Sequence, residues 1–188
     1  SERFPIDFIT VIHKDKDNRI YIGTNNGMLI YETEKDSVFR IPDFNPRIFS
    51  IAPKDESNLW IGTGSGLYLY EKDQKQFIEQ TQNQITNDKL RQIVVLSFLP
   101  YDEEHFLLGT RAHGLLLLDN VNGDLKKIKL NKSKDLSFSI RDIINYNEKI
   151  LVGTDGAGLI VLGPDLQFES SYILDEDVSG SLSNNGIY

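Results

Sequence analysis

The stretch Asn58–Tyr70, NLWIGTGSGLYLY, joins two apolar runs through a short segment of small residues. The first run ends at Gly62-Thr63, and Gly66 opens the second. Leu, Ile, Trp and Tyr favour strands, whereas Gly and Ser favour turns. The pattern therefore predicts two strands joined by a tight hairpin. Its glycines supply positive φ and let a neighbouring backbone approach, and its threonine can bond to the backbone near the turn.

The Gly-Thr pair is repeated along the chain, and its flanks are repeated with it. Successive pairs lie about 40 to 50 residues apart, which is the period of four-stranded propeller blades. Each pair stands between two apolar runs, and a polar stretch with a weaker strand ends each unit. The pairs are Gly23-Thr24, Gly62-Thr63, Gly109-Thr110 and Gly153-Thr154. The apolar pairs that precede them, spaced by three, are Ile9/Ile12, Ile48/Ile51, Ile93/Leu96 and Ile140/Ile143.

The inner strands of each unit are apolar at nearly every position, which is typical of strands buried on both faces. A two-sheet sandwich would show alternation, and no stretch has the 3.6-residue period of a long amphipathic helix. We expect an all-β fold, a β-propeller segment of four four-stranded antiparallel blades that forms part of a larger propeller. The expected domain covers residues 1–188, with blades at about 6–42, 45–82, 87–131 and 137–175 and the start of a further blade at 182–188.

Composition excludes several classes of function. The net charge of −8 argues against nucleic-acid binding, which needs basic patches. The absence of cysteine removes disulfides and thiolate metal sites. His13, His105 and His113 fall in different loop types, so we expect no metal and no cofactor. Trp60 is expected in the core. A phosphate-cradling loop is disfavoured because such loops lead into a helix.

The repeat resembles the two-component regulator propeller repeat. That pattern has an apolar-Trp-apolar-Gly-Thr run, a short spacer, then Gly-Leu and an aromatic strand. The stretch LWIGTGSGLYLY matches it nearly letter for letter, and YIGTNNGMLIY, LLGTRAHGLLLLD and LVGTDGAGLIVL match with substitutions. The resemblance spans essentially the whole chain.

The resemblance implies a role in signalling. Such repeats build the extracytoplasmic, periplasmic sensor of bacterial hybrid two-component systems, whose histidine kinase parent controls polysaccharide utilisation. It implies an oligosaccharide ligand, a homodimeric parent, membrane contact only through that parent, and no enzymatic activity in this segment. Two alternatives remain, a non-catalytic propeller that binds another protein and a propeller glycosidase or lyase. Because an open arc of blades exposes inter-blade faces, the isolated chain is expected to dimerise or aggregate.

We label the strands of a blade A to D in chain order. In a propeller the B–C turns and the D–A connections share one face, which is the usual ligand face. Arg, Asn, Asp and His hydrogen-bond sugar hydroxyls, although Asn and Asp also serve turns for backbone reasons alone. The candidate ligand-binding residues are Asn26, Arg47, Arg91, Arg111, His113, Arg141 and Asp155, with Asn25, Ser65, Asn87 and Asn184 beside them. No catalytic residue is expected.

Overall fold

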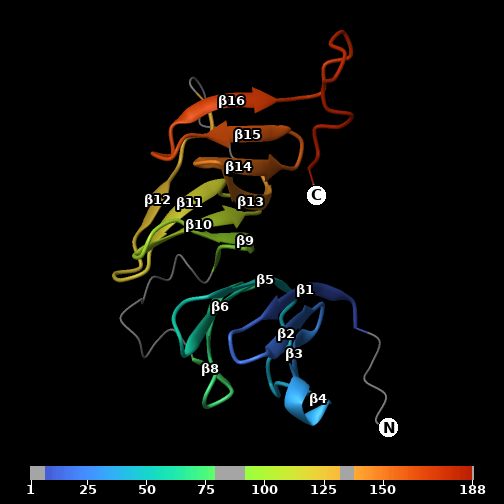
Figure 1. The fold of residues 1–188 in the computed structure, drawn as a ribbon, viewed down its shortest axis with the longest axis vertical. Helices are drawn as coiled ribbons and strands as arrows, with labels where there is room; N and C mark the ends of the chain where they lie inside the picture. The colour runs from blue at the N-terminus through green and yellow to red at the C-terminus, as the bar shows by residue number, and fades with distance from the viewer. Residues whose placement is uncertain (1–6, 79–91, 132–137, 188) are drawn as a thin grey trace. The chain divides into compact units, whose positions relative to one another are not determined.

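The chain folds into four antiparallel sheets of four strands each, in a computed structural model that describes residues 7–78, 92–131 and 138–187 (Figure 1). Each sheet is a propeller blade in which successive strands pair in chain order. This confirms the predicted fold class. The chain divides into two compact units, residues 1–95 and 96–188. Within the described residues, no helix is long and apolar enough to cross a membrane.

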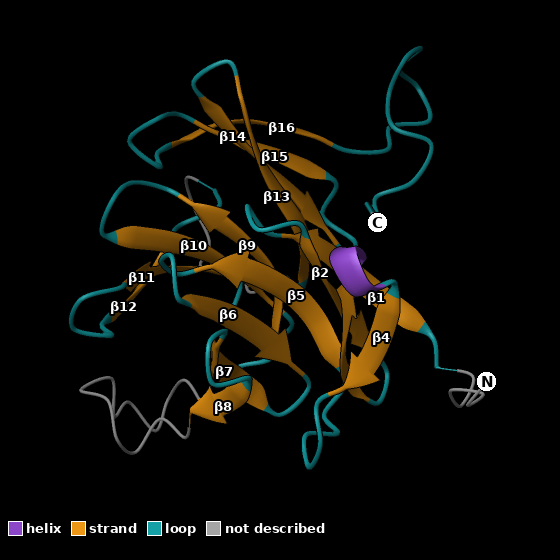
Figure 2. Cartoon of the chain, turned by 60° about the horizontal axis from the view of Figure 1, so that its bottom comes forward, coloured by secondary structure: helices purple, strands orange, loops and turns teal. Residues whose placement is uncertain are grey.

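The first unit contains the first two blades. The first blade consists of β1 (Ile9–Lys14), β2 (Arg19–Thr24), β3 (Gly27–Glu32) and β4 (Ser37–Arg40), with a short 3-10 turn, η1 (Thr33–Lys35). The second blade consists of β5 (Ile48–Pro53), β6 (Asn58–Thr63), β7 (Gly66–Glu71) and β8 (Gln76–Ile78). Strands dominate the described chain, as the cartoon coloured by secondary structure shows (Figure 2).

The second unit contains the other two blades. The third blade begins at the unit boundary and consists of β9 (Val95–Pro100), β10 (His105–Thr110), β11 (Leu115–Asp119) and β12 (Leu125–Lys127). The fourth consists of β13 (Ile140–Tyr146), β14 (Lys149–Thr154), β15 (Leu159–Leu162) and β16 (Phe168–Tyr172).

The inner strands are buried on both faces, as their unbroken apolar runs predict. In β6 and β10 every residue after the first is buried. Trp60 lies fully inside the first unit, so its expected core position is confirmed. The outer strand β12 carries Lys126 and Lys127 in exposed positions. Charged residues on an edge strand disfavour pairing with other chains.

The first strand of a blade is irregular at a fixed place. The register shifts between Ile48 and Ser50, and Ser50 then pairs with Gly62 of the Gly-Thr pair. In the third blade a Cβ added at Gly109 would overlap the Ser97 hydroxyl, so Ser97 holds the same position. The residue equivalent to Ile48 is therefore Val95. The spacing of the sequence placed Ile93 there, and that assignment was wrong by two residues. Like shifts occur at Ile9/Val11 and Ile140/Asp142.

Candidate functional site

The threonine of each Gly-Thr pair closes the B–C turn that follows it. The hydroxyl of Thr110 donates to the Gly114 carbonyl at 2.7 Å and accepts from the His113 N–H at 2.9 Å. Thr24 makes the same two bonds, to Gly27 at 2.8 Å and from Asn26 at 3.0 Å. All four threonines are fully buried: Thr24, Thr63, Thr110 and Thr154. A buried hydroxyl that joins both ends of a turn fixes the residues between them.

The glycine that ends each turn has the left-handed backbone predicted for it. The φ angles are 83° at Gly27, 126° at Gly66, 73° at Gly114 and 74° at Gly158. At Gly27 a Cβ would also overlap the carbonyl oxygen of Phe44. Glycine is therefore required at this position for its backbone conformation and for the close approach.

The B–C turns are hydrogen-bonded to the D–A connections. In the first unit the Gly64 N–H donates to the Arg47 carbonyl at 2.9 Å. In the second unit the Asp155 N–H donates to the Ser139 carbonyl at 2.9 Å, and the Gly158 N–H donates to the Asn185 carbonyl at 2.8 Å. Turns and connections thus lie on the same face within each unit. We call this surface the turn face.

In the first unit the turn face carries Asn26 and Arg47, both exposed. The Asn26 carbonyl accepts a hydrogen bond from Arg40, which also pairs with Asp7. The guanidinium of Arg47 lies 5.0 Å from the ring centre of Phe49. That geometry is a cation–π contact, and it leaves an aromatic ring beside a cation at the surface. Candidates Asn87 and Arg91 lie outside the described residues.

In the second unit Arg111 and His113 share one exposed turn. Neither is a typical turn former, and the Thr110 bond to the His113 N–H fixes the backbone that carries them. Arg141 and Asp155 form an ion pair on the fourth blade. Their charges are therefore directed at each other.

Among the predicted site residues the structure thus pairs Arg141 with Asp155, whereas Arg111 and His113 share a turn because they lie two residues apart in the sequence. Sequence reasoning missed Arg40 and Phe49, which contact Asn26 and Arg47. Each had only a weak signal, an arginine near the end of a weak strand and an aromatic one residue into the next first strand.

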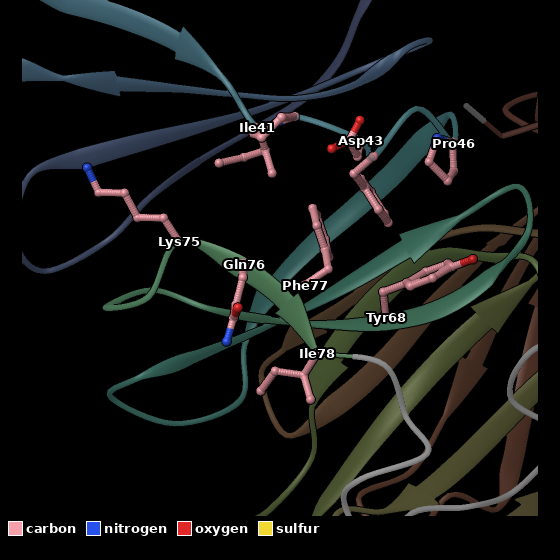
Figure 3. A pocket seen from close by; sticks show the side chains of 10 residues that line it. Ile41, Asp43, Pro46, Tyr68, Lys75, Gln76, Phe77 and Ile78 are labelled. Atoms are coloured by element: carbon pink, nitrogen blue, oxygen red, sulfur yellow. The ribbon is translucent and has the colours of Figure 1, made fainter.

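A second feature missed from the sequence is a pocket of about 460 Å³ in the first unit, between the Ile41–Pro46 connection and β8 (Figure 3). The rings of Phe44 and Phe77 stack with centres 3.4 Å apart. Tyr68 meets Phe44 edge-on at 5.0 Å. The Tyr68 hydroxyl lies 3.3 Å from the Ser65 hydroxyl, which joins this wall to a B–C turn. The pocket is thus lined in part by aromatic residues and lies beside the turn face.

The groups with clearly shifted pKa values lie away from the turn face. Burial raises the pKa of the Tyr21 hydroxyl to about 12. Hydrogen bonds from Lys35 and Lys75 lower the pKa of Glu32 to about 2. No group of three or more His, Cys, Asp or Glu among the described residues could hold a metal ion. In the first unit the turn face carries the Arg47 guanidinium beside the Phe49 ring, and in the second unit it carries Arg111 and His113.

Comparison with known proteins supports the repeat. Residues 3–26 match the family model described as Two component regulator propeller. The match covers β1 and β2 and includes Gly23-Thr24, whereas the copy at residues 58–70 resembles the repeat pattern most fully. No curated protein matches the chain.

Solved structures show the same fold at low identity. The extracellular domain of a putative hybrid two component system from B. thetaiotaomicron matches with a TM-score of 0.61 and 18% identity, over 99% of this chain and 31% of that one. PorZ, a surface component of the type-IX secretion system of Porphyromonas gingivalis, matches with a TM-score of 0.66 and 14% identity. This match covers 95% of this chain and 28% of that one. An ancestral GH74 enzyme matches with a TM-score of 0.64 and 10% identity. This match covers 86% of this chain and 23% of that one. The chain spans less than a third of each of these structures.

Proposed function

Since residues 3–26 match the two-component regulator propeller model, we propose that the chain is a ligand-sensing segment of the extracytoplasmic sensor of a hybrid two-component system. In this proposal the segment is periplasmic and binds an oligosaccharide. It is not itself an enzyme, and it acts on transcription through a homodimeric histidine kinase parent. The similarity to extracellular domains of such systems supports the class of protein, and the turn face supports the class of ligand.

The observation that carries the proposal is the turn of Arg111 and His113. Both side chains are exposed, and the buried Thr110 hydroxyl fixes the backbone between them. A preorganised donor pair loses little freedom when a ligand binds, so more of the contact energy appears as affinity. Guanidinium and imidazole N–H groups are donors to the hydroxyls of a sugar.

The ion pair of Arg141 and Asp155 suggests how binding reaches the rest of the chain. A sugar hydroxyl that bonds to either side chain competes with their mutual contact. Asp155 also lies on a turn whose backbone bonds to the Ser139 connection. A ligand shifts a conformational equilibrium only when it contacts two states differently, and a breakable ion pair supplies such a difference.

The test is a calorimetric titration of the chain with a panel of oligosaccharides. One glycan class is expected to bind, and Arg111→Ala/His113→Ala is expected to weaken that binding at least tenfold. Lys126→Ala is the matched control, because Lys126 is an exposed cation on β12 of the same blade and lies outside the turns. Equal loss in both variants, or binding unchanged in the double variant, would overturn the assignment of this turn. A panel with no binding sugar would overturn the ligand class.

A further inference from the structure

The pocket between residues 41–46 and β8 contains a departure from the repeat. Tyr68 on β7 pairs with Ile61, the residue that precedes Gly62 of the Gly-Thr pair. The other three blades have an aliphatic residue at this register position, at most 9% exposed in each case: Leu29, Leu116 and Ile160. Tyr68 is only half-buried. The three other blades therefore show that the fold itself does not require an aromatic residue at this position.

Tyr68 belongs to a group of three aromatic residues with Phe44 and Phe77, which we call the aromatic wall (Figure 3). The rings of Phe44 and Phe77 stack with centres 3.4 Å apart, and Tyr68 meets Phe44 edge-on at 5.0 Å. Phe44 is buried, whereas Tyr68 and Phe77 are half-buried. The aromatic wall thus has one ring held in the core and two rings that keep part of their surface outside it.

Polar groups accompany the aromatic wall. The Tyr68 hydroxyl lies 3.3 Å from the hydroxyl of Ser65, an exposed turn residue. Asp43 and Gln76 also line the pocket, and both are exposed. Hydroxyl, amide and carboxylate groups form hydrogen bonds with the hydroxyl groups of a ligand. An apolar lining with a few polar groups that fix orientation is typical of small-molecule sites.

The charges at the pocket favour a neutral ligand. Asp43 and Lys75 are the charged residues among those that line it. The Lys75 ammonium lies 2.8 Å from the Glu32 carboxylate and 4.6 Å from the ring centre of Phe39. Its charge is therefore already balanced within the first unit. An anionic ligand would compete with Glu32 and be repelled by Asp43, and the exposed Asp43 carboxylate gives a cationic ligand little attraction in water.

The size of the pocket fits a small ring. Its volume of about 460 Å³ lies within the range of about 300–1,000 Å³ that is typical of small-molecule sites. The features above call for a ligand with an apolar face, hydrogen-bonding groups at its edge and no charge. A pyranose ring has all three, because C–H groups lie on its faces and hydroxyl groups surround it.

We propose that this pocket binds one neutral sugar ring, with a C–H face of the ring against Tyr68 and Phe77 and its hydroxyl groups toward Asp43 and Gln76. The site belongs to the first unit, whereas the turn of Arg111 and His113 belongs to the second. The proposal thus goes beyond the proposed function by adding a second binding site, and it stands on contacts that the first site does not use.

The test is saturation-transfer-difference NMR of the 188-residue chain with methyl glycosides of neutral hexoses and pentoses as probes. At least one glycoside is expected to bind, with the strongest transfer to the ring protons of one face. Tyr68→Leu is expected to weaken that binding at least fivefold. Leucine is the residue that the first and third blades have at this position, so the variant should fold as those blades do.

Tyr146→Leu is the matched control, because Tyr146 is an exposed tyrosine on β13 of the second unit. It should leave glycoside binding unchanged. Phe77→Val is a second variant of the aromatic wall. It introduces the residue that Val38 provides at the same register of the first blade, and it should also weaken binding. Circular dichroism of each variant shows whether the sheets are retained.

Two results would overturn the inference. One is a panel in which no glycoside binds. Binding of benzyl alcohol alone would then identify a pocket for aromatic ligands. The other is a glycoside that binds folded Tyr68→Leu and Phe77→Val as tightly as the unchanged chain. If Arg111→Ala/His113→Ala instead abolished that binding, the pocket proposal would fail and the turn would be supported. Loss of binding in the aromatic-wall variants alone would support the pocket, whatever the outcome at the turn.

Discussion

The two units have the same turns and different cores. Both close each B–C turn with a buried threonine and a left-handed glycine. The core cluster of the first unit contains three buried aromatic residues, Tyr21, Phe44 and Tyr70, whereas the buried members of the second cluster are all aliphatic. The repeat therefore specifies the backbone of the blade, and any apolar set of the right volume can fill the space between blades.

A core that contains tyrosine also contains buried hydroxyl groups. The two buried tyrosines of the first unit differ in whether their hydroxyl has a hydrogen-bond partner. The Tyr21 hydroxyl donates to the Asp15 carboxylate at 3.1 Å. The Tyr70 hydroxyl is buried and has no hydrogen-bond partner among the described residues. The rings meet edge-on with centres 6.0 Å apart. Burial raises the pKa of both hydroxyls, because an ionised phenolate is poorly solvated there.

The largest loss of stability should come from replacing the turn glycines, and it should be the same in both units. Gly27→Ala and Gly158→Ala should each cost more than about 3 kcal/mol, because a Cβ would overlap a backbone carbonyl at a left-handed position. Gly156→Ala is the control, with φ of 104° and nothing within 4 Å of the added Cβ. It should cost about 1–2 kcal/mol. Urea denaturation followed by circular dichroism measures all three. A clear difference between Gly27→Ala and Gly158→Ala would show that the turns are not equivalent.

The second-largest effect, a loss of stability at high pH, should occur in the first unit before the second. The folded pKa of Tyr21 is raised from 10.0 to about 12, so the stability gained from keeping it protonated is present below pH 10 and lost as the pH rises toward 12. Trp60, the single tryptophan, lies in the first unit, so its fluorescence follows that unit. Hydrogen exchange of β10 and β14 follows the second unit.

We expect the fluorescence transition in urea to move to lower denaturant between pH 10 and pH 12, ahead of any loss of protection in β10 and β14. Tyr21→Phe should reduce that shift. Simultaneous loss in both units, or a shift of the same size in Tyr21→Phe, would contradict the role given to this hydroxyl.

The smallest effect concerns the two hydroxyls at neutral pH. Tyr21→Phe removes the bond to Asp15 and should cost about 1 kcal/mol. Tyr70→Phe removes a buried hydroxyl that lacks a partner among the described residues, so it should leave stability unchanged or raise it by up to about 1 kcal/mol. Each variant is the other's matched control, and denaturant midpoints compare them. Equal destabilisation by both would show that Tyr70 has a partner.

Most of the fold follows from the sequence because the repeated pattern is local. Gly62-Thr63 between two apolar runs is enough to predict a hairpin, and repetition predicts the number of blades. The position of Val95 was missed because a register shift is set by pairing with another strand and leaves no mark on sequence spacing. Phe44 and Phe77 are far apart in the chain, so the pocket that they both line depends on packing that periodicity does not reveal.

The sequence was enough to predict which turn residues belong to the candidate site, but not how their side chains pair. Turn residues such as Arg111 and His113 are found from the repeat, because the turn itself places them. The ion pair of Arg141 with Asp155 joins a first strand to a turn, and the contact of Arg47 with Phe49 depends on side-chain conformation. Such pairings need the three-dimensional arrangement.

The seating of Ile48 over Gly23, repeated by Ile140 over Gly109, has an evolutionary consequence. Each of these repeats carries, at the end of its second strand, the glycine over which the next repeat packs, so an in-frame duplication of one whole repeat creates a matching joint on both sides at once. A gene built this way can lengthen or shorten its array by unequal recombination without inventing a new contact. The sequences between the joints are then free to diverge, as the aromatic and aliphatic cores of the two units have done.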